Sequence, residues 1–315
     1  MELLEKIKTV KSLIGNTPVV QLRNAPCRLF AKLEYMSFWG SIKDRAAYNI
    51  LYNAIAEDLI NEDTVIVEST SGNFGIALGG ICKMLSLKFI PVIDPNIVSE
   101  KESLLRLLSH DVIKVTERDA TEGYLLTRIK AVAAYKAENK NAYNPNQYEN
   151  RHNYLAYYYT LAEEIVNSFP KLDYLFVSVS TGGTITGLSL KLKEKFKDIK
   201  IIAVDVQGSL IFSDQAKPRS ISGIGASMRS AIINKALIDD VIILSQHEIV
   251  KGCTDLLNGQ GIFVGASAGA AYYAANCYLQ ERGEKDKTAL FVCPDKGTAY
   301  LDNIYNKEWV KSNIN

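Results

Sequence analysis

Short apolar runs alternate with longer amphipathic stretches along most of the chain. Runs rich in Val and Ile predict strands, and they lie at residues 64–70, 88–94, 112–116, 174–180, 200–206, 241–244 and 289–294. Helical spacing of apolar positions begins at residue 74, covers 97–108, and recurs after 184. Several runs end in clusters of Gly, Ser or Thr before the helical pattern begins, as strands do in parallel sheets. This alternation predicts an α/β fold.

Two stretches lack any period. Residues 141–153 are dense in Asn and Tyr and predict a long connection between two halves, with a lobe boundary near it. Residues 207–229 carry Gly208, Pro218, Gly223 and Gly225. This composition predicts a mobile or functional loop.

Composition limits the classes of function. With 315 residues, 47% of them hydrophobic, the chain can bury a large core. The formal net charge is only +1, which argues against a nucleic-acid or anionic-membrane partner and leaves small-molecule ligands open. No apolar run reaches the ~18 residues that span a bilayer, and no signal-peptide pattern is visible, so we expect a cytoplasmic protein.

Cysteines and histidines offer no metal chemistry. The five cysteines are odd in number, scattered and never in a Cys-x-x-Cys pair, which predicts buried reduced thiols rather than disulfides. The three histidines lie at no metal-ligand spacing, so we expect no metal site. Hydrolase elbow and Walker motifs are also missing.

Two junctions between a predicted strand and a predicted helix could bind anions. Ser180-Thr181-Gly182-Gly183-Thr184 would present backbone N–H groups and hydroxyls at a helix N-terminus, as a phosphate requires. Residues 69–73 form a second junction, suited to a carboxylate. The alternative for either junction is a tight turn without a ligand.

Lys43 follows a glycine turn in the sequence Gly40-Ser41-Ile42-Lys43-Asp44-Arg45 and lies near a predicted helix start. The positive end of that helix would favour the neutral amine that imine formation needs. The alternative is a solvated helix end, which is what a Lys-Asp-Arg run usually is.

These motifs occur together in one order. They are residues 32–36 (KLEYM), 40–45 (GSIKDR), 69–73 (STSGN), 180–184 (STGGT), 223–225 (GIG) and 265–269 (GASAG). In this combination the chain resembles the cysteine synthase (O-acetylserine sulfhydrylase) family of fold type II pyridoxal-phosphate enzymes, from residue 15 to residue 297. The resemblance implies a two-lobed, tryptophan synthase β-like α/β fold with the cofactor in the cleft between parallel-sheet lobes. Residues 41–150 would form a smaller mobile lobe, and residues 1–40 plus 151–315 the larger cofactor-binding lobe.

The resemblance also implies site residues and a cofactor, pyridoxal 5'-phosphate. Lys43 would form the Schiff base and shuttle the Cα proton. The remaining cofactor contacts would come from Asn73 at the ring oxygen, Ser267 at the pyridine nitrogen, and Ser180, Thr181, Gly182, Gly183 and Thr184 at the phosphate. The substrate carboxylate would be received by Thr70, Ser71, Asn73 and Gln147, with the loop at Gly223 closing over it.

A neutral hydroxyl such as that of Ser267 cannot keep the ring nitrogen protonated as an aspartate would. The ring is then a weaker electron sink, which favours expulsion of a group from Cβ over transamination or racemisation. We therefore expect β-replacement on an L-serine or L-cysteine derivative, through an aminoacrylate intermediate and with ping-pong kinetics.

Within the family, residues 32–36, 68–73, 123–128, 146–148 and 223–227 resemble the N-(2-amino-2-carboxyethyl)-L-glutamate synthase branch, which joins O-phosphoserine to glutamate. Arg128 could then contact a dianionic leaving group or a second carboxylate, supported by Tyr148. The alternative is an exposed helix arginine. Two departures stand against this: Ser37-Phe38-Trp39 replaces the usual Asn-Pro-Gly, and Met228-Arg229 follows residue 227 where that branch has arginine first.

Three functions remain open. The first is amine addition with O-phosphoserine and glutamate. The second is sulfur chemistry, either O-acetylserine sulfhydrylation or a cysteine-consuming lyase that releases hydrogen sulfide. The third is a non-catalytic binding module. For the enzymes we expect small amino-acid substrates and a homodimer.

Overall fold

The computed structural model describes residues 2–70, 72–120 and 123–314. The chain forms two compact units, which we describe separately. Unit 1 contains residues 1–15 and 37–156, and unit 2 contains residues 16–36 and 157–315. The first fifteen residues therefore belong with the smaller unit, whereas the sequence grouped them with the larger one. Helix α1 (Leu3–Val10) explains the difference, because it buries Leu3, Ile7 and Val10 and packs against helices of unit 1.

Unit 1 is built on a parallel four-stranded sheet in the order β5-β4-β3-β6. Its strands are β3 (Val65–Ser69), β4 (Lys88–Ile93), β5 (Ile113–Lys114) and β6 (Ala142–Tyr143). The central strands are buried on both faces, which is why their sequences are nearly continuous apolar runs. Val132 packs with Val67, Ile90 and Val92 on one face of the sheet.

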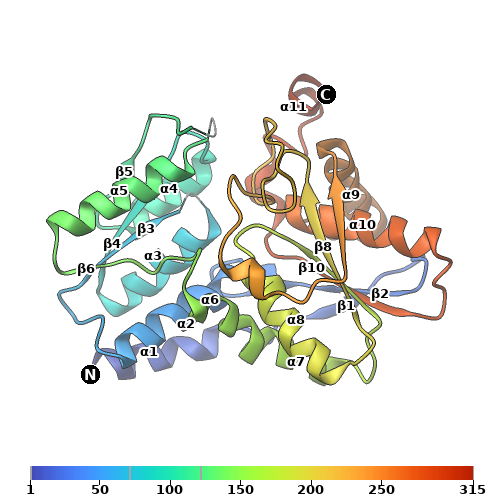
Figure 1. The fold of residues 1–315 in the computed structure, drawn as a ribbon, viewed down its shortest axis with the longest axis horizontal. Helices are drawn as coiled ribbons and strands as arrows, with labels where there is room; N and C mark the ends of the chain where they lie inside the picture. Colours follow the sequence, from blue (N-terminus) through green and yellow to red (C-terminus); the bar gives the residue numbers. More distant parts are fainter. Residues whose placement is uncertain (1, 71, 121–122, 315) are drawn as a thin grey trace. The chain divides into compact units, whose positions relative to one another are not determined.

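Helices cover this sheet (Figure 1). They are α1, α2 (Lys43–Ala56), α3 (Asn73–Leu85), α4 (Ser99–Leu108), α5 (Leu125–Glu138) and α6 (Arg151–Ala156), with short 3-10 turn η1 (Lys11–Leu13). Helix α5 packs on β3, β4 and β6, whereas α3 packs on β4 and is itself covered by α1, α2 and α4. Glycines let neighbours approach α3 closely: a Cβ at Gly79 would lie 2.9 Å from Leu108 Cβ.

Unit 2 contains a six-stranded sheet in the order β1-β2-β10-β7-β8-β9. Its strands are β1 (Val19–Gln21), β2 (Arg28–Lys32), β7 (Tyr174–Ser178), β8 (Lys200–Val206), β9 (Asp240–Leu244) and β10 (Thr288–Val292). Only the β1–β2 pair is antiparallel. The central strand β10 pairs on one side with β2, near the beginning of the chain, and on the other with β7.

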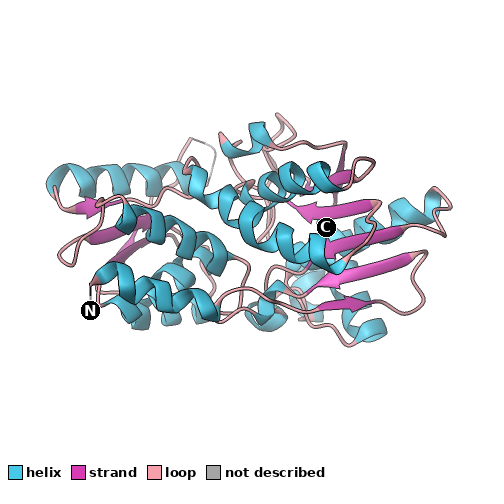
Figure 2. Ribbon diagram, turned by 90° about the horizontal axis from the view of Figure 1, so that it is seen from below, coloured by secondary structure: helices cyan, strands magenta, loops and turns pink. Residues whose placement is uncertain are grey.

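The larger sheet also has helices on its faces, and Figure 2 shows these helices and strands in separate colours. The helical elements are α7 (Ala162–Ser168), α8 (Gly183–Lys195), α9 (Gln246–Gln260), α10 (Ala266–Glu281) and α11 (Lys307–Asn313), with η2 (Glu34–Met36), η3 (Tyr157–Leu161), η4 (Ile232–Lys235) and η5 (Gly297–Tyr300). Helix α10 packs on β7 to β10 and beneath α9, and α8 contacts β7 and is covered by α7 and η3.

The α/β class and the parallel sheets expected from the sequence are confirmed. Each predicted strand is present, although β5 is shortened to two residues. Residues 207–229 form no helix or strand, as predicted. Residues 141–153 are more ordered than the long connection predicted, because β6 and the start of α6 lie within them. None of the helices in the described ranges is long and apolar enough to cross a membrane.

Candidate active site

Lys43 is the first residue of α2. The turn before it is fixed by Asp44, whose Oδ2 accepts a hydrogen bond from the backbone N–H of Trp39 at 2.8 Å. Asp44 and Arg45 are 0% and 2% exposed, while Lys43 is only partly buried. The alternative of a solvated helix end is therefore wrong for Asp44 and Arg45.

The junction at residues 69–73 leads from β3 into α3, which begins at Asn73. Thr70 is buried, and its Oγ1 accepts a hydrogen bond from the Gly75 N–H at 2.9 Å. That contact leaves the Thr70 hydroxyl proton available to an acceptor. Ser71, the other expected carboxylate ligand of this loop, lies outside the described residues.

Gln147 lies beside the same junction, although it follows 78 residues later in the sequence. Its Nε2 donates to the carbonyl of Ser69 at 3.1 Å, and its side chain is buried. Next to it is Glu68, a carboxylate 1% exposed inside an otherwise apolar strand. Sequence reasoning missed Glu68, although one acid within the run VIVES was a visible signal.

Arg128 and Tyr148 occupy the same region of unit 1. Arg128 is buried in α5, and its Nε lies 3.1 Å from Asp94 Oδ2, so the alternative of an exposed helix arginine is wrong. Burial raises the pKa of Tyr148 to about 12, with the charge of Arg128 opposing that rise. The guanidinium thus has a carboxylate partner within the protein.

In unit 2, residues 180–184 connect β7 to α8, and their geometry suits a phosphate. Gly182 has φ +85°, and a Cβ there would lie 3.0 Å from Ile233 Cβ, so glycine alone is accommodated without strain. Gly183 is the first residue of α8, where backbone N–H groups are unpaired within the helix. The buried Oγ1 of Thr181 has no hydrogen-bond partner among the described residues. An anion bound here would accept hydrogen bonds from the backbone N–H groups and from the Thr181 hydroxyl.

Ser230 supports residues 180–184, here called the cradle, through a hydrogen bond to their backbone. Its buried hydroxyl donates to the carbonyl of Thr181 at 2.6 Å. The following helical turn η4 is tied to the same place, because Thr186 donates to the carbonyl of Ile232 at 3.2 Å. Sequence reasoning missed Ser230, because the contact joins residues 49 positions apart.

Ser267 is the second residue of α10 and is buried. Its carbonyl accepts a hydrogen bond from Ser178 Oγ at 2.6 Å. Ser178 is the last residue of β7, the strand that runs into the cradle. Ser267 and the cradle therefore belong to the same edge of the larger sheet.

The loop containing Gly223 is held against that edge. The N–H of Gly225 donates to the carbonyl of Val179 at 2.8 Å. Arg219 donates through Nη1 to the Ile224 carbonyl at 3.2 Å and through Nη2 to Ser227 Oγ at 3.3 Å. Burial lowers the pKa of Arg219, and the nearby Asp205 carboxylate opposes that fall. Arg219 is a further residue that the sequence did not identify.

The cysteines lie in environments that suppress thiolate chemistry. Burial raises the pKa of Cys253 to about 12 and of Cys27 to about 11. Within the described ranges, no three His, Cys, Asp or Glu side chains group closely enough to hold a metal ion.

Comparison with known proteins gives one family and several similar structures. The family model described as "Pyridoxal-phosphate dependent enzyme" matches residues 10–295. A hydrogen sulfide-producing enzyme from Fusobacterium nucleatum is 33% identical over 93% of this chain and 99% of its own, with a TM-score of 0.87. An O-acetylserine dependent cystathionine β-synthase from Helicobacter pylori is 31% identical over 94% and 98%, with a TM-score of 0.86. O-acetylserine sulfhydrylase isoform 3 from Entamoeba histolytica is 27% identical over 94% and 90%, with a TM-score of 0.86.

Proposed function

The chain belongs to the pyridoxal-phosphate dependent enzymes, and we propose that it replaces the β-substituent of an L-serine or L-cysteine derivative. The observation that carries the proposal is the glycine cradle of unit 2, which holds the buried donor of Thr181. In unit 1, by itself, Lys43 lies at the start of a helix, where the sequence predicts the imine. The similar enzymes that act on O-acetylserine or release hydrogen sulfide support the reaction class.

The residues divide into cofactor and substrate groups in this proposal. The cofactor would be held by Lys43, Asn73, Ser180, Thr181, Gly182, Gly183, Thr184 and Ser267. Bound pyridoxal phosphate supplies an electron sink that weakens the Cα–H bond and allows the Cβ substituent to leave. Ser267 offers the ring nitrogen a neutral hydroxyl in the first turn of α10, where the positive helix end disfavours a protonated nitrogen.

The substrate is bound and deprotonated by residues of unit 1. Thr70, Ser71, Asn73 and Gln147 receive the α-carboxylate through neutral donors. The ε-amine of Lys43 takes the proton from Cα, and the helix N-terminus at which it lies favours the neutral amine required for this step. From the sequence resemblance, the loop at Gly223 would close over the substrate.

A spectral titration tests the proposal. The purified protein with its cofactor is mixed in turn with O-phosphoserine, O-acetylserine, serine and cysteine. We expect at least one to shift the visible absorbance band of the lysine-bound cofactor, and a nucleophile added afterwards to restore it. Absence of a shift with all four compounds would contradict the proposal.

A reaction that uses or releases sulfide is better supported than the addition of an amine. The most similar of the enzymes named above produces hydrogen sulfide, and it aligns over nearly its whole length. Incubation with cysteine, followed by measurement of sulfide and of the amino-acid product, distinguishes a sulfide-releasing lyase from an O-acetylserine sulfhydrylase.

Coupling of O-phosphoserine to glutamate is the second candidate. It draws support from the sequence resemblance at residues 32–36, 68–73, 123–128, 146–148 and 223–227. The proposed anion contact would have to use the face of the Arg128 guanidinium not engaged by Asp94. Detection of a coupled product by mass spectrometry after incubation with both substrates would establish it.

Assembly and location remain predictions of the sequence. We propose a cytoplasmic homodimer, the commonest symmetric assembly. Light scattering of the enzyme with its cofactor would measure the mass in solution, and a single-chain mass of 34.9 kDa would rule the dimer out.

A further inference from the structure

Glu68 is the penultimate residue of β3, two residues before Thr70, and its carboxyl group is almost fully buried. Its Oε2 accepts hydrogen bonds from Asn144 Nδ2 at 2.9 Å and from the backbone N–H of Asn146 at 2.7 Å, and Gln147 also hydrogen-bonds this carboxyl group. Asn144 Nδ2 also reaches the carbonyl of Val67 at 2.8 Å. Glu68 therefore fixes the start of residues 144–153, here called the Asn-rich segment, against β3.

The bonds to Glu68 define where Gln147 lies. Asn146 adopts φ +50°, a left-handed conformation that turns the chain immediately before Gln147. Asn153 Nδ2 donates to the carbonyl of Gln147 at 2.6 Å, and this second bond also fixes the backbone of Gln147. Gln147 then directs its amide to the Ser69 carbonyl, beside the junction.

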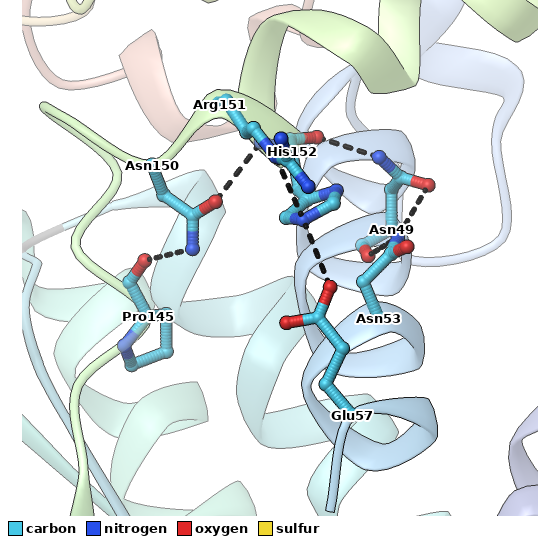
Figure 3. Close-up of polar contacts among 7 residues, drawn as sticks. All are labelled: Asn49, Asn53, Glu57, Pro145, Asn150, Arg151 and His152. Atoms are coloured by element: carbon cyan, nitrogen blue, oxygen red, sulfur yellow. Dashed lines mark hydrogen bonds and ion pairs between the residues drawn. The ribbon is translucent and has the colours of Figure 1, made fainter. Parts of the chain in front are cut away.

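The far end of the Asn-rich segment is bonded to α2, the helix that begins at Lys43 (Figure 3). Asn49 Nδ2 donates to the carbonyl of His152 at 2.7 Å. Asn150 stiffens the turn between the two ends, because its Nδ2 donates to Pro145 O at 2.9 Å and its Oδ1 accepts from His152 N at 2.9 Å. One short segment thus touches both the strand before Thr70 and the helix that carries Lys43.

We infer that Glu68 is a positioning residue for substrate binding: it holds the Asn-rich segment so that Gln147 is preorganised to receive the substrate carboxylate. This inference rests on the proposed function, since it assumes that Gln147 contacts substrate. A buried acceptor that two N–H groups share cannot be removed without leaving both donors unsatisfied. The segment would then lose its fixed position although the sheet stays intact.

The test compares three variants of the enzyme with bound cofactor. Glu68→Leu removes the acceptor with little change in volume, Glu68→Gln keeps one carbonyl oxygen, and Glu138→Leu makes the same change on an exposed position of α5. For Glu68→Leu we expect KM for the amino-acid donor to rise about tenfold or more, with kcat within about threefold of the wild type. Glu68→Gln should bring KM back to within about threefold of the wild type, because two donors can share one oxygen.

Amide hydrogen exchange of residues 144–148 gives a readout independent of turnover. We expect faster exchange there in Glu68→Leu than in Glu138→Leu. If both the exchange and KM of Glu68→Leu equal those of the control, or if kcat falls while KM stays constant, the inference is overturned. If Glu68→Leu does not fold, Glu68→Ala and Glu68→Asp are compared in the same way. Failure of the wild type to turn over any serine-derived donor would refute the proposed function, and the exchange measurement would still decide the role of Glu68.

Discussion

The indole of Trp39 lies directly on Gly80 in α3, so that a Cβ at position 80 would lie within 2.5 Å of Trp39 Cδ1 and Cε2. Trp39 is one of the residues at which the chain departs from the family pattern. The glycine in the middle of an otherwise apolar helix accommodates it. The neighbouring Phe38 remains 58% exposed and meets Trp39 edge to face, with ring centroids 4.9 Å apart.

This contact predicts that the effect of Gly80→Ala on the free energy of unfolding reverses its sign when the Trp39 side chain is removed. Gly80→Ala should destabilise the wild type by about 1–3 kcal/mol, because the methyl group overlaps a part-buried indole. In a Trp39→Ala background the same substitution should stabilise by up to ~1 kcal/mol, since alanine is the better helix former. Denaturant unfolding of the four proteins of this cycle measures both effects, and equal effects in the two backgrounds would contradict the contact.

Lys43→Ala should abolish covalent attachment of the cofactor. We expect loss of the visible band of the lysine-bound cofactor and a decrease in turnover of several orders of magnitude, because both the attachment and the proton transfer are removed. Absorbance and borohydride reduction followed by mass spectrometry check this. Lys11→Ala, at an exposed residue of unit 1, is the control and should keep the band.

Ser230→Ala should weaken binding of the cofactor phosphate. The substitution removes the 2.6 Å hydrogen bond that fixes the Thr181 carbonyl, and we expect the cofactor Kd to rise about fivefold to tenfold, as for ~1 kcal/mol. Titration of the cofactor-free protein with pyridoxal phosphate measures it. Ser312→Ala, at an exposed hydroxyl that bonds within α11, should leave the Kd unchanged.

Arg219→Lys should loosen the loop at Gly223. Lysine keeps the charge near Asp205 but lacks the planar fork that reaches both Ile224 and Ser227. We expect kcat/KM to fall about tenfold and the amides of residues 222–227 to exchange faster. Arg282→Lys, at a side chain that is 44% exposed and lies outside this loop, is the control, and equal behaviour of the two variants would argue against a clamp.

The stability of the protein should also depend on the ionisation of Glu68. Burial raises the pKa of this carboxyl from 4.5 to about 8, while hydrogen bonds from Asn146 and Gln147 and the charge of Arg128 oppose the rise. Between pH 4.5 and about pH 8, Glu68 keeps its proton in the folded protein but has lost it in the unfolded chain. The free energy of unfolding contributed by Glu68 therefore falls as pH rises through this window.

Glu68→Gln cannot titrate, so its Tm relative to the wild type should increase between about pH 5 and about pH 8. Thermal melts of both proteins, with Glu138→Gln as the control, measure this difference. Parallel Tm curves for Glu68→Gln and the wild type would show that Glu68 is already ionised at low pH.

The sequence predicted those parts of the fold whose signal is local. Strands such as β3 and β8 were recognised because both faces are buried and the sequence is continuously apolar. Strand β2 was not, because it ends in Lys32, a lysine 1% exposed whose partner Glu164 lies 132 residues away and 2.7 Å from it. Helix α10 shows little amphipathic period because nearly every small residue in its first half is buried.

The site follows the same rule. Residues 180–184 and the start of α2 are contiguous motifs, and the sequence predicted the local structure of both. Arg219 and Ser230 act through partners brought near by the fold, so no local pattern marks them. Glu68 was visible as one acid in an apolar strand, but its partners are also brought near by the fold. Arg128 is the clearest example, because the sequence of α5 does not indicate that the carboxylate of Asp94 lies beside this arginine.

The pairing of β2 with β10 has a consequence for synthesis of the protein. Arg28 lies next to Thr288, 260 positions later, so the middle of the larger sheet cannot close until the ribosome has synthesised β10. Unit 1 is complete by residue 156. Nascent chains should therefore acquire a folded first unit early. Until β10 has been made, β2 can pair only with β1, and its other edge stays open to non-native pairing that a chaperone would have to prevent.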